Sequence, residues 1–407
     1  MKLSVYGGMA NNLYVLAHEV QNIPGLQCRF IRDRNDRFAF SQPSWEDCAA
    51  TLSYDDVLES SSWSWDRWSQ WERDAHWQKP YWVDDPGYDD ADLKLEDCFR
   101  EANLLLVCGV AATVAAYQSG RPYVILPHGG DIRLAAGLVR TPSRRWMHKL
   151  FGHPQDRILR KAYERARAVV THGPLRIGGP LSKEPKSMTD YLPGVRFERL
   201  SIPIRPRQRA DAATRRAKLN AVLDRLGLPP VDAPMVLFVP SRVDYFWKGQ
   251  DRLVEALQQL GANNDFHVLF SGWGKDYADL RGRVGDIAAT FLPFSVSKQV
   301  LYEFFTSVDI VVDQFILGHY GTATQEAMAC GAPVMTWNNE SEYHEQCRTP
   351  PPIINVRSVE DIRRALQGLR SGSINAEAIG LEGKGWIGQN HSASQVADRL
   401  RSIMDGI

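Results

Sequence analysis

The chain lacks the features that mark membrane-spanning, disulfide-stabilised and nucleic-acid-binding proteins. No stretch reaches the roughly 18 consecutive apolar residues of a membrane-spanning helix. Its 48 basic and 48 acidic residues give a formal net charge of zero, so no overall positive field attracts nucleic acid. None of the six cysteines belongs to a Cys-x-x-Cys pair, so we expect buried thiols of a reducing compartment rather than disulfides or a zinc site. The N-terminus runs directly into an apolar strand and a glycine loop instead of a signal peptide, and we expect a cytoplasmic protein.

Alternating strand and helix candidates predict an α/β protein with two doubly wound domains. A chain of 407 residues exceeds the roughly 300 residues at which single cores usually split. In the first half, apolar runs predict strands at 2–6, 27–31, 104–108, 123–126 and 168–171. In the second half they predict strands at 235–239, 267–271, 290–292, 308–312, 333–336 and near Ile353. Prolines and arginines interrupt the pattern between Ser201 and Gln208, where we expect the hinge, and an amphipathic helix is predicted for 392–404.

The most informative segment is 308–334, which predicts a strand, a glycine loop, a helix and the next strand. Gly318 and Gly321 let the backbone approach a ligand closely, and the start of the following helix suits a phosphate group. Glu326 lies about one turn into that helix, where a carboxylate can accept hydrogen bonds from ribose hydroxyls. The segment therefore indicates a nucleotide diphosphate bound at a helix start.

A second segment strengthens this interpretation. The apolar run 235–239 is followed by Pro240-Ser241-Arg242, five further residues and Lys248-Gly249. Considered separately, Arg242 and Lys248 would be ordinary solvated charges of a surface loop. Upstream of the segment that contains Glu326, they indicate a binding site for an anion.

Both segments resemble the signature of the family-four retaining glycosyltransferases, which have two Rossmann-like domains facing across a cleft (the GT-B fold). The family pattern is Glu-Gly-Phe-Gly, a few residues, then Glu-Ala-Met-Ala-x-Gly-x-Pro-Val, with seven residues between the two glutamates. Glu326 matches the second glutamate, which binds the ribose, and Gly318 replaces the first, which lies near the transferred sugar. The resemblance implies that the backbone of His319, Tyr320 and Gly321 takes over that contact.

The resemblance assigns the donor diphosphate to Arg242, Lys248 and the helix start at Gly321 and Thr322. A leaving diphosphate gains negative charge, so fixed cations stabilise the transition state more than the ground state. No separate nucleophile is evident, which fits the family's front-face mechanism, in which the departing phosphate helps to deprotonate the acceptor hydroxyl. We therefore expect a metal-independent, hexosyltransferase-like enzyme with no cofactor beyond its co-substrate, a nucleotide diphosphate sugar. Its acceptor would be a carbohydrate, lipid-linked or other hydroxyl compound in the biosynthesis of polysaccharides, glycolipids or other glycoconjugates.

The resemblance also implies that the two domains bind different substrates. Residues 1–205 would bind the acceptor and residues 206–389 the donor, with 390–407 crossing back onto the N-terminal domain. Gly8 and Asn11 follow the first strand, and His128, with Asp131 and Arg133, follows the strand at 123–126. The resemblance places Gly8 at the cleft, where its loop approaches the donor phosphate and the acceptor, and His128 beside the transferred sugar. A tight turn at Gly8 and a local cap at His128 are the simpler interpretations. On the donor side the predicted contacts, which could equally be ordinary strand-end turns, are Gly272, Trp273, Leu292 and Pro293.

Three segments fall outside the resemblance. Six tryptophans between Trp63 and Trp82 indicate an insertion that packs its rings into the N-terminal domain, with an acceptor-binding wall as the alternative. Residues 144–167 mix Arg and Lys with Trp, Leu and Phe, which fits either a solvated helix or peripheral contact with the inner face of an anionic membrane. Asp90-Ala91-Asp92 is interpreted as a solvated acidic loop, because no third metal ligand lies nearby in the sequence.

Two other functions remain open. A sugar-nucleotide epimerase on the same fold would need carboxylates placed as acid and base on the sugar, and no such set stands at matching positions. A non-catalytic nucleotide-sugar-binding pseudoenzyme or partner subunit would explain why Gly318 stands where the family has a glutamate. Hydrolysis of the donor in the absence of an acceptor distinguishes an enzyme from a binder.

Overall fold

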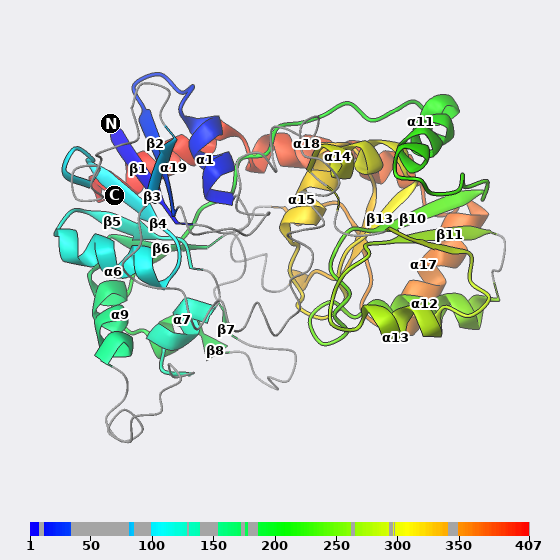
Figure 1. The fold of residues 1–407 in the computed structure, drawn as a ribbon, viewed down its shortest axis with the longest axis horizontal. Helices are drawn as coiled ribbons and strands as arrows, with labels where there is room; N and C mark the ends of the chain where they lie inside the picture. Colours follow the sequence, from blue (N-terminus) through cyan, green and yellow to red (C-terminus); the bar gives the residue numbers. More distant parts are fainter. Residues whose placement is uncertain are drawn as a thin grey trace. The chain divides into compact units, whose positions relative to one another are not determined.

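The computed structural model describes residues 1–7, 12–33, 81–84, 99–127, 130–138, 154–171, 176–177, 186–261, 265–292, 296, 298–340 and 349–406. Their contacts divide them into two compact units. Unit 1 contains the described residues up to Pro203 and those from His391 onward, and unit 2 runs from Ile204 to Asn390. Figure 1 shows a sheet with packed helices in each unit. The predicted borders, after residues 205 and 389, lie within two residues of these.

A seven-stranded sheet forms the centre of unit 1, with strand order β3-β2-β1-β4-β5-β6-β9. All neighbours pair in parallel except β3, which runs antiparallel to β2. The strands are β1 (Lys2–Tyr6), β2 (Gln27–Asp33), β3 (Tyr81–Asp84), β4 (Leu104–Val107), β5 (Tyr123–Ile125), β6 (Ala168–Thr171) and β9 (Phe197–Arg199). A separate two-stranded sheet consists of β7 (Arg176–Ile177) and β8 (Lys186–Ser187).

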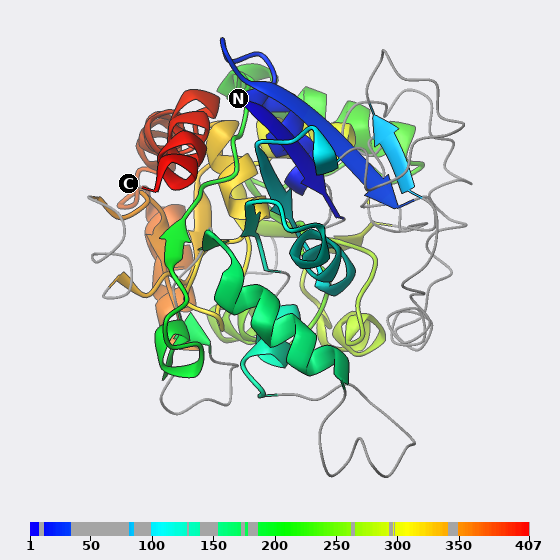
Figure 2. The same cartoon turned by 90° about the vertical axis from the view of Figure 1, so that its left-hand side faces the viewer.

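Helices cover both faces of this sheet, because successive residues of a strand point to opposite sides. Leu104 and Leu106 of β4 pack in the same core as α1 (Asn12–Val20) and α19 (Ala393–Asp405). Leu105 and Val107 pack in the core formed with α6 (Val110–Ser119), α7 (Gly130–Ala135) and α9 (Pro154–Arg165), and the short α10 (Met188–Tyr191) precedes β9. Figure 2 shows α19, in red, beside the strands of unit 1. The predicted return of the C-terminal helix to the N-terminal domain is thereby confirmed.

Unit 2 contains a six-stranded, fully parallel sheet in the order β12-β11-β10-β13-β14-β15. Its strands are β10 (Met235–Val239), β11 (Phe266–Phe270), β12 (Ala289–Phe291), β13 (Ile310–Val312), β14 (Val334–Thr336) and β15 (Ile354–Asn355). One face packs on α11 (Ala212–Arg225), α14 (Lys298–Ser307), α15 (Thr322–Ala329) and α18 (Ala376–Asn390). The other face packs on α12 (Gln250–Leu260), α13 (Tyr277–Arg283) and α17 (Val359–Ser371).

The prediction of two doubly wound α/β domains is confirmed, and the strands predicted from apolar runs are correct to within two residues. The pattern misses β3 and β9, which lie at the two edges of the unit 1 sheet, and both strands of the small sheet, β7 and β8. In β9, Glu198 and Arg199 replace the apolar run that marks a central strand. Among the helices that the structure describes, none is long and apolar enough to span a bilayer.

Candidate functional site

The predicted donor residues of unit 2 follow the carboxyl ends of its strands, which all lie at one edge of the parallel sheet. At the centre of this edge is Asp313, the residue that follows β13, and its side chain is fully buried. It forms an ion pair with Lys248 (Nζ to Oδ1, 3.4 Å) and accepts hydrogen bonds from the hydroxyls of Ser241 (2.5 Å) and Thr324 (2.8 Å). One buried carboxylate therefore connects the loop after β10, the end of β13 and helix α15.

The charge on Asp313 is maintained by these contacts. Burial acts to raise the pKa of its carboxyl group, but the Lys248 ammonium and the donated hydrogen bonds outweigh burial and hold the pKa below its ordinary value. Lys248 also donates to the side-chain oxygen of Gln314 at 3.2 Å, and its side chain is 19% exposed. Its ammonium is therefore fixed in position, with one side directed at protein acceptors.

Gly321 begins α15 right beside this carboxylate. A Cβ atom on Gly321 would lie 3.2 Å from Oδ2 of Asp313, so a larger residue would require a small shift of that carboxylate or of the helix start. The hydrogen bond from Thr324 ties the first turn of α15 to the same atom. The structure thus brings together three predicted elements, namely Lys248, Gly321 and the helix start at Thr322, and such a start offers unpaired N–H groups to an anion.

Glu326 lies one turn into α15, as predicted, and is 5% exposed. Its Oε1 is ion-paired with Lys298, the first residue of α14. Its Oε2 is buried and has no hydrogen-bond partner among the described residues. A buried carboxylate oxygen without a donor is unfavourable unless a ligand supplies one, so this oxygen is available to a ligand hydroxyl.

Arg242 is anchored on a different buried carboxylate from Lys248. Its Nε lies 3.5 Å from Oδ2 of Asp244, whose other oxygen lies 3.0 Å from Nζ of Lys275. Asp244 is 2% exposed, whereas the side chains of both cations are 37% exposed. Two partly exposed cations thus share one buried negative charge, which leaves net positive charge for an anionic ligand.

The glycine turn after β11 packs directly on the loop that carries Arg242. The N–H of Val243 donates to the carbonyl of Trp273 at 2.8 Å. Gly274 has φ 128°, and a Cβ there would lie 2.2 Å from the carbonyl oxygen of Val243, so this position requires glycine. Gly272 and Trp273 are therefore held against the Arg242 loop and remain partly exposed.

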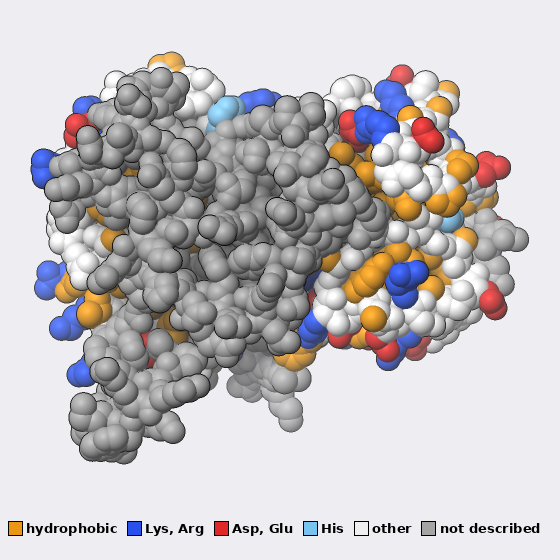
Figure 3. All heavy atoms as spheres, viewed as in Figure 1, with side chains coloured by type: hydrophobic (Ala, Val, Ile, Leu, Met, Phe, Trp, Pro, Cys, Tyr) orange, Lys and Arg blue, Asp and Glu red, His pale blue; other side chains and the backbone are white. Residues whose placement is uncertain are grey.

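Aromatic rings accompany the cations on this part of unit 2. Phe246 is 38% exposed and stands in edge contact with Trp247, with ring centres 5.0 Å apart. The Nζ of Lys275 lies 5.5 Å from the centre of the Phe246 ring. Hydrophobic and basic side chains also adjoin on the visible face of unit 2 (Figure 3). The Phe246 ring beside Lys275 suits a ligand that combines a flat ring with negative charge.

The loop at Gly318 has no room for a side chain. Gly318 has φ 68°, and a Cβ there would lie 3.0 Å from the ring of Trp337 and 3.2 Å from Cβ of Asn339. The following His319 places Nδ1 3.3 Å from the carbonyl of Leu317, and burial lowers the pKa of its imidazole, so the ring is neutral at pH 7. The carbonyl of His319 accepts a hydrogen bond from the side-chain amide of Gln314.

Two predicted donor contacts have side chains that point into the core. Tyr320 is fully buried and packs against Trp386, with ring centres 5.6 Å apart. Leu292 is 1% exposed and belongs to the same core. A donor contact at either residue is therefore limited to its backbone.

The structure places the acceptor-side candidates only in part. Arg133 is exposed in the last turn of α7, and the backbone of Asp131 lies in the same helix. Four more predicted site residues lie outside the described residues, namely Asn11 of the acceptor side, the donor-binding candidates Gly8 and Pro293, and the catalytic candidate His128. The tryptophan segment and Asp90-Ala91-Asp92 also lie outside them, apart from β3, which contains Trp82.

Comparison with known proteins relates unit 2 to glycosyltransferases. Residues 227–348 match the family model described as glycosyl transferases group 1. Over 148 residues the chain is 31% identical to D-inositol 3-phosphate glycosyltransferase of Xylanimonas cellulosilytica, a stretch that covers 35% of this chain and 33% of that protein. The chain thus matches about a third of the length of this curated relative.

Solved structures resemble the chain over a greater length. Anabaena HepE in complex with UDP-glucose superimposes with a TM-score of 0.52 at 13% identity, covering 77% of this chain and 81% of that one. Sucrose-phosphate synthase from Thermosynechococcus elongatus superimposes with a TM-score of 0.52 at 14% identity, covering 100% of both chains. These likenesses show that the two units form a GT-B fold.

Proposed function

We propose that this chain is a retaining glycosyltransferase that moves a hexose from a nucleotide diphosphate sugar to an acceptor hydroxyl. The main support is that the carboxylate of Asp313 contacts both Lys248 and Thr324, the latter in the first turn of α15. This shared contact fixes Lys248 beside the start of the helix. Lys248, Asp313 and α15 all belong to the part of the chain that matches the glycosyl transferases group 1 model. A fixed cation and a helix start at one place form a site for a doubly charged anion.

Transfer in this proposal depends on charge stabilisation of the leaving group. When the bond between the sugar and the diphosphate breaks, negative charge grows on the diphosphate oxygens. Lys248, Arg242 and the N–H groups of Gly321 and Thr322 would face that charge, and groups held in place before the reaction stabilise such a charge most strongly. These groups supply the positive charge that a bound metal ion provides in other phosphate-transferring enzymes, so the proposal includes neither a metal nor a cofactor.

Glu326 would bind the nucleoside part of the donor. Its unpartnered Oε2 can accept hydrogen bonds from the ribose hydroxyls, while Lys298 holds the other oxygen. Lys298 also supplies the counter-charge that makes a buried carboxylate tolerable at this position.

Retention would follow from a front-face reaction in which the departing phosphate accepts the proton of the acceptor hydroxyl. Asp313 and Asp244 are buried and committed to cations, which makes them unsuitable as nucleophiles. His128 stays in the proposal as the residue beside the transferred sugar, and unit 1 as the acceptor-binding half. The acceptor would be a carbohydrate or lipid-linked hydroxyl compound of glycan, glycolipid or other glycoconjugate biosynthesis.

We also propose a reducing, cytoplasmic location with peripheral membrane contact through residues 144–167. Burial raises the pKa of Cys28 and Cys330 to about 12, so these free thiols are unreactive, as suits a cytoplasmic protein. Within the described part of this segment, α9 exposes Ile158, at 36%, among basic residues. Co-sedimentation with vesicles containing phosphatidylserine tests this contact, and binding that is equal for neutral vesicles would contradict it.

A thermal-shift screen with UDP, GDP, ADP and their hexose derivatives tests the main proposal. A ligand present at a hundred times its dissociation constant adds about 2.7 kcal/mol of stability. UDP and UDP-glucose are the first probes, because Anabaena HepE was solved in complex with UDP-glucose. An enzyme should also hydrolyse the stabilising donor slowly without an acceptor, whereas a non-catalytic binder should not. A chain stabilised by none of these nucleotides would contradict the proposal.

A further inference from the structure

A buried amide with no hydrogen-bond partner among the described residues lies at the carboxyl edge of the unit 2 sheet. Asn338 comes two residues after β14, and it is 2% exposed. Neither its Oδ1 nor its Nδ2 has a hydrogen-bond partner among the residues that the structure describes. Burying a carboxamide in this way destabilises a folded protein, so its presence calls for a compensating role.

The amide does not hold its own segment in place. The N–H of Asn338 donates to Oδ1 of Asn355 at 2.8 Å, and Nδ2 of Asn355 donates to the carbonyl of Asn338 at 3.0 Å. The backbone of Asn338 is therefore satisfied by another residue. Its own side-chain atoms remain available to a ligand.

The segment that contains Asn338 packs on the Gly318 loop. The N–H of Trp337 donates to the carbonyl of Gln314 at 2.8 Å, and the N–H of Asn339 donates to the carbonyl of Gly318 at 2.8 Å. Gln314 also accepts a hydrogen bond from Lys248 at 3.2 Å. Asn338 thus lies between two residues that are bonded to the loop next to the proposed diphosphate site.

The same segment explains why the Gly318 position contributes no side chain. The Trp337 ring and Cβ of Asn339 occupy the space into which a side chain at Gly318 would extend. A polar side-chain contact to the sugar must then come from another residue at this edge. Asn338 is a neighbouring residue whose buried polar atoms lack partners among the described residues.

We propose that Asn338 binds hydroxyl groups of the donor's sugar and is a specificity-determining residue of the site. The inference rests on the proposed function, since it assumes that a nucleotide diphosphate sugar binds at this edge. A carboxamide has one acceptor oxygen and a donor NH₂ group, so it can pair with two neighbouring hydroxyls of a hexose. A site that leaves these groups unpaired rejects a sugar lacking the hydroxyls, because the buried amide would remain unsatisfied.

Calorimetric binding of UDP and UDP-glucose to the parent and to Asn338→Leu tests this role. Leucine has nearly the shape of asparagine and no polar atoms. We expect the affinity for UDP to stay within twofold and the affinity for UDP-glucose to fall at least tenfold. The ligand-free protein should melt at a higher temperature, because a buried unsatisfied group has been removed. Asn338→Ala provides a second variant with the same expected change in the ratio of the two affinities.

Thr336→Val is the matched control. Thr336 is a fully buried polar residue two positions away, but its hydroxyl donates to the carbonyl of Gln314 at 2.8 Å. Removing that hydroxyl should lower the melting temperature and leave the ratio of UDP-glucose to UDP affinity unchanged. A purely structural role for Asn338 would make its variants behave like this control.

The outcomes separate this inference from the proposed function. If the parent binds both ligands and the Asn338 variants keep the parent's affinity ratio, the inference is overturned and the donor assignment stands. Equal losses for UDP and UDP-glucose, together with a lower melting temperature in Asn338→Leu, also overturn it. If the parent binds UDP but not UDP-glucose, Asn338 does not bind the hydroxyl groups of a glucose-like sugar, and the inference is overturned for such a donor. A parent that binds neither ligand contradicts the proposed function, and the inference fails with it.

Discussion

Lys248 and Arg242 carry the same charge, but their surroundings predict different consequences of removing it. Lys248 is the cation paired with the fully buried Asp313. Arg242 shares Asp244 with Lys275, which remains as a counter-charge when Arg242 is lost. The sequence treats the two as equivalent, whereas the structure makes Lys248 a stabilising residue as well as a proposed ligand of the diphosphate.

We predict that Arg242→Ala lowers kcat about a hundredfold, the effect of losing roughly 3 kcal/mol of charge stabilisation, while the melting temperature stays near that of the parent.

Lys248→Met should lower kcat to a similar extent and also cost about 3 kcal/mol of stability, because an unpaired buried carboxylate remains. In the double variant Lys248→Met/Asp313→Asn the melting temperature should recover and the activity should not. Equal melting temperatures for Lys248→Met and the parent would contradict this account of Asp313.

For Glu326 we predict that Glu326→Gln weakens the binding of UDP itself, with no sugar attached. Losing hydrogen bonds to a charged acceptor costs about 1.5–3 kcal/mol, which is roughly a 10- to 150-fold change in affinity. Calorimetry with UDP measures it, and Glu382→Gln, at an exposed position of α18, is the control that should bind as the parent does. If Glu326→Gln binds UDP as tightly as the parent, the ribose assignment is wrong.

Introducing at position 318 the glutamate that the resembled family has there should not raise activity. Gly318→Glu puts a side chain on a residue with φ 68°, against the ring of Trp337. The backbone strain alone costs about 1–3 kcal/mol, so we expect a lower melting temperature in both Gly318→Glu and Gly318→Ala. Donor hydrolysis above the parent rate in Gly318→Glu would show that the loop accepts the carboxylate.

The sequence predicts some residues of the candidate site and misses their partners for a physical reason. Arg242, Lys248 and Glu326 stand out because their spacing fits an anion site around a strand, a loop and a helix. Asp313 and Lys298 have no such pattern, since each gains its partner only when distant segments fold together. One weak signal was present, because Asp313 follows the apolar run 308–312 and polar residues at strand ends often lie in sites.

At the scale of elements, apolar runs predict the central strands because both faces of a parallel strand are buried. Asp309 interrupts the predicted run 308–312, and β13 starts only after it, at Ile310. The carboxylate of Asp309 accepts from the N–H of Val236 at 2.7 Å and pairs with Arg216 at 3.1 Å. Asp309 therefore joins the start of β13 to β10 and α11. The sequence does not reveal this role, because the contacting residues are distant along the chain.

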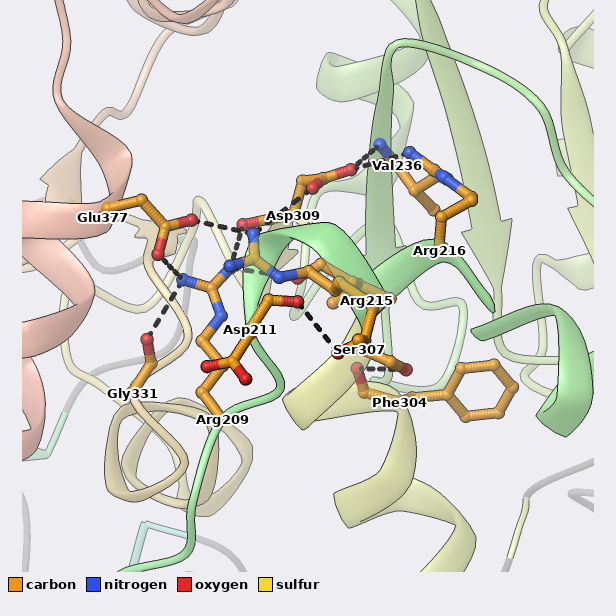
Figure 4. A network of polar contacts seen from close by, with 12 residues as sticks. Arg209, Asp211, Arg215, Arg216, Val236, Phe304, Ser307, Asp309, Gly331 and Glu377 are labelled. Carbon is orange, nitrogen blue, oxygen red and sulfur yellow. Dashed lines mark hydrogen bonds and ion pairs between the residues drawn. The ribbon is translucent and has the colours of Figure 1, made fainter. Parts of the chain in front are cut away.

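This junction belongs to a network of polar contacts that ties Arg209, near the start of unit 2, to the rest of that unit (Figure 4). Arg209 donates to the carbonyls of Val308 and Asp309, each at 3.0 Å, and to that of Gly331 at 3.3 Å. Glu377 of α18 pairs with Arg209 at 3.1 Å and with Arg215 at 2.7 Å. Burial, reinforced by the charge of nearby Arg215, lowers the pKa of Arg209 to about 10, so the guanidinium remains charged at pH 7.

We predict that Arg209→Met destabilises unit 2 by about 3 kcal/mol, because three carbonyl groups lose a charged donor. The affinity for UDP at 25 °C should be unchanged, since Asp309 and Gly331 precede their strands and the candidate site lies at the opposite, carboxyl edge of the sheet. Thermal denaturation and calorimetry measure the two effects, with Lys218→Met, an exposed cation of α11, as the control. A lower UDP affinity in Arg209→Met would show that the two edges are coupled.

At the scale of the whole molecule, each unit has its own two-sided core, and the chain passes between the units twice. On the unit 1 side, His391 Nδ1 lies 3.0 Å from the carbonyl of Ile202, so the two passing segments are bonded to each other. On the unit 2 side, the N–H of Arg207 donates to the carbonyl of Ala329 at 3.0 Å. The hinge at 201–208 stays a prediction. Between these two hydrogen bonds lie residues 203–206, where Pro203 and Pro206 restrict the backbone.

Because the proposed nucleotide-binding residues that the structure describes lie in unit 2, damage confined to unit 1 should leave nucleotide binding intact. Leu400 of α19 is fully buried in the core that joins this helix to the unit 1 sheet. Leu400→Asp buries an unpaired charge there and should cost several kcal/mol of unit 1 stability. We expect calorimetric unfolding to show one transition at a lower temperature and a second that UDP still shifts upward, while transfer to an acceptor is lost. The exposed Leu381 of α18 allows Leu381→Asp as the control, with both transitions unchanged. If UDP no longer stabilises any transition in Leu400→Asp, nucleotide binding requires unit 1, and the assignment of the donor mainly to unit 2 is wrong.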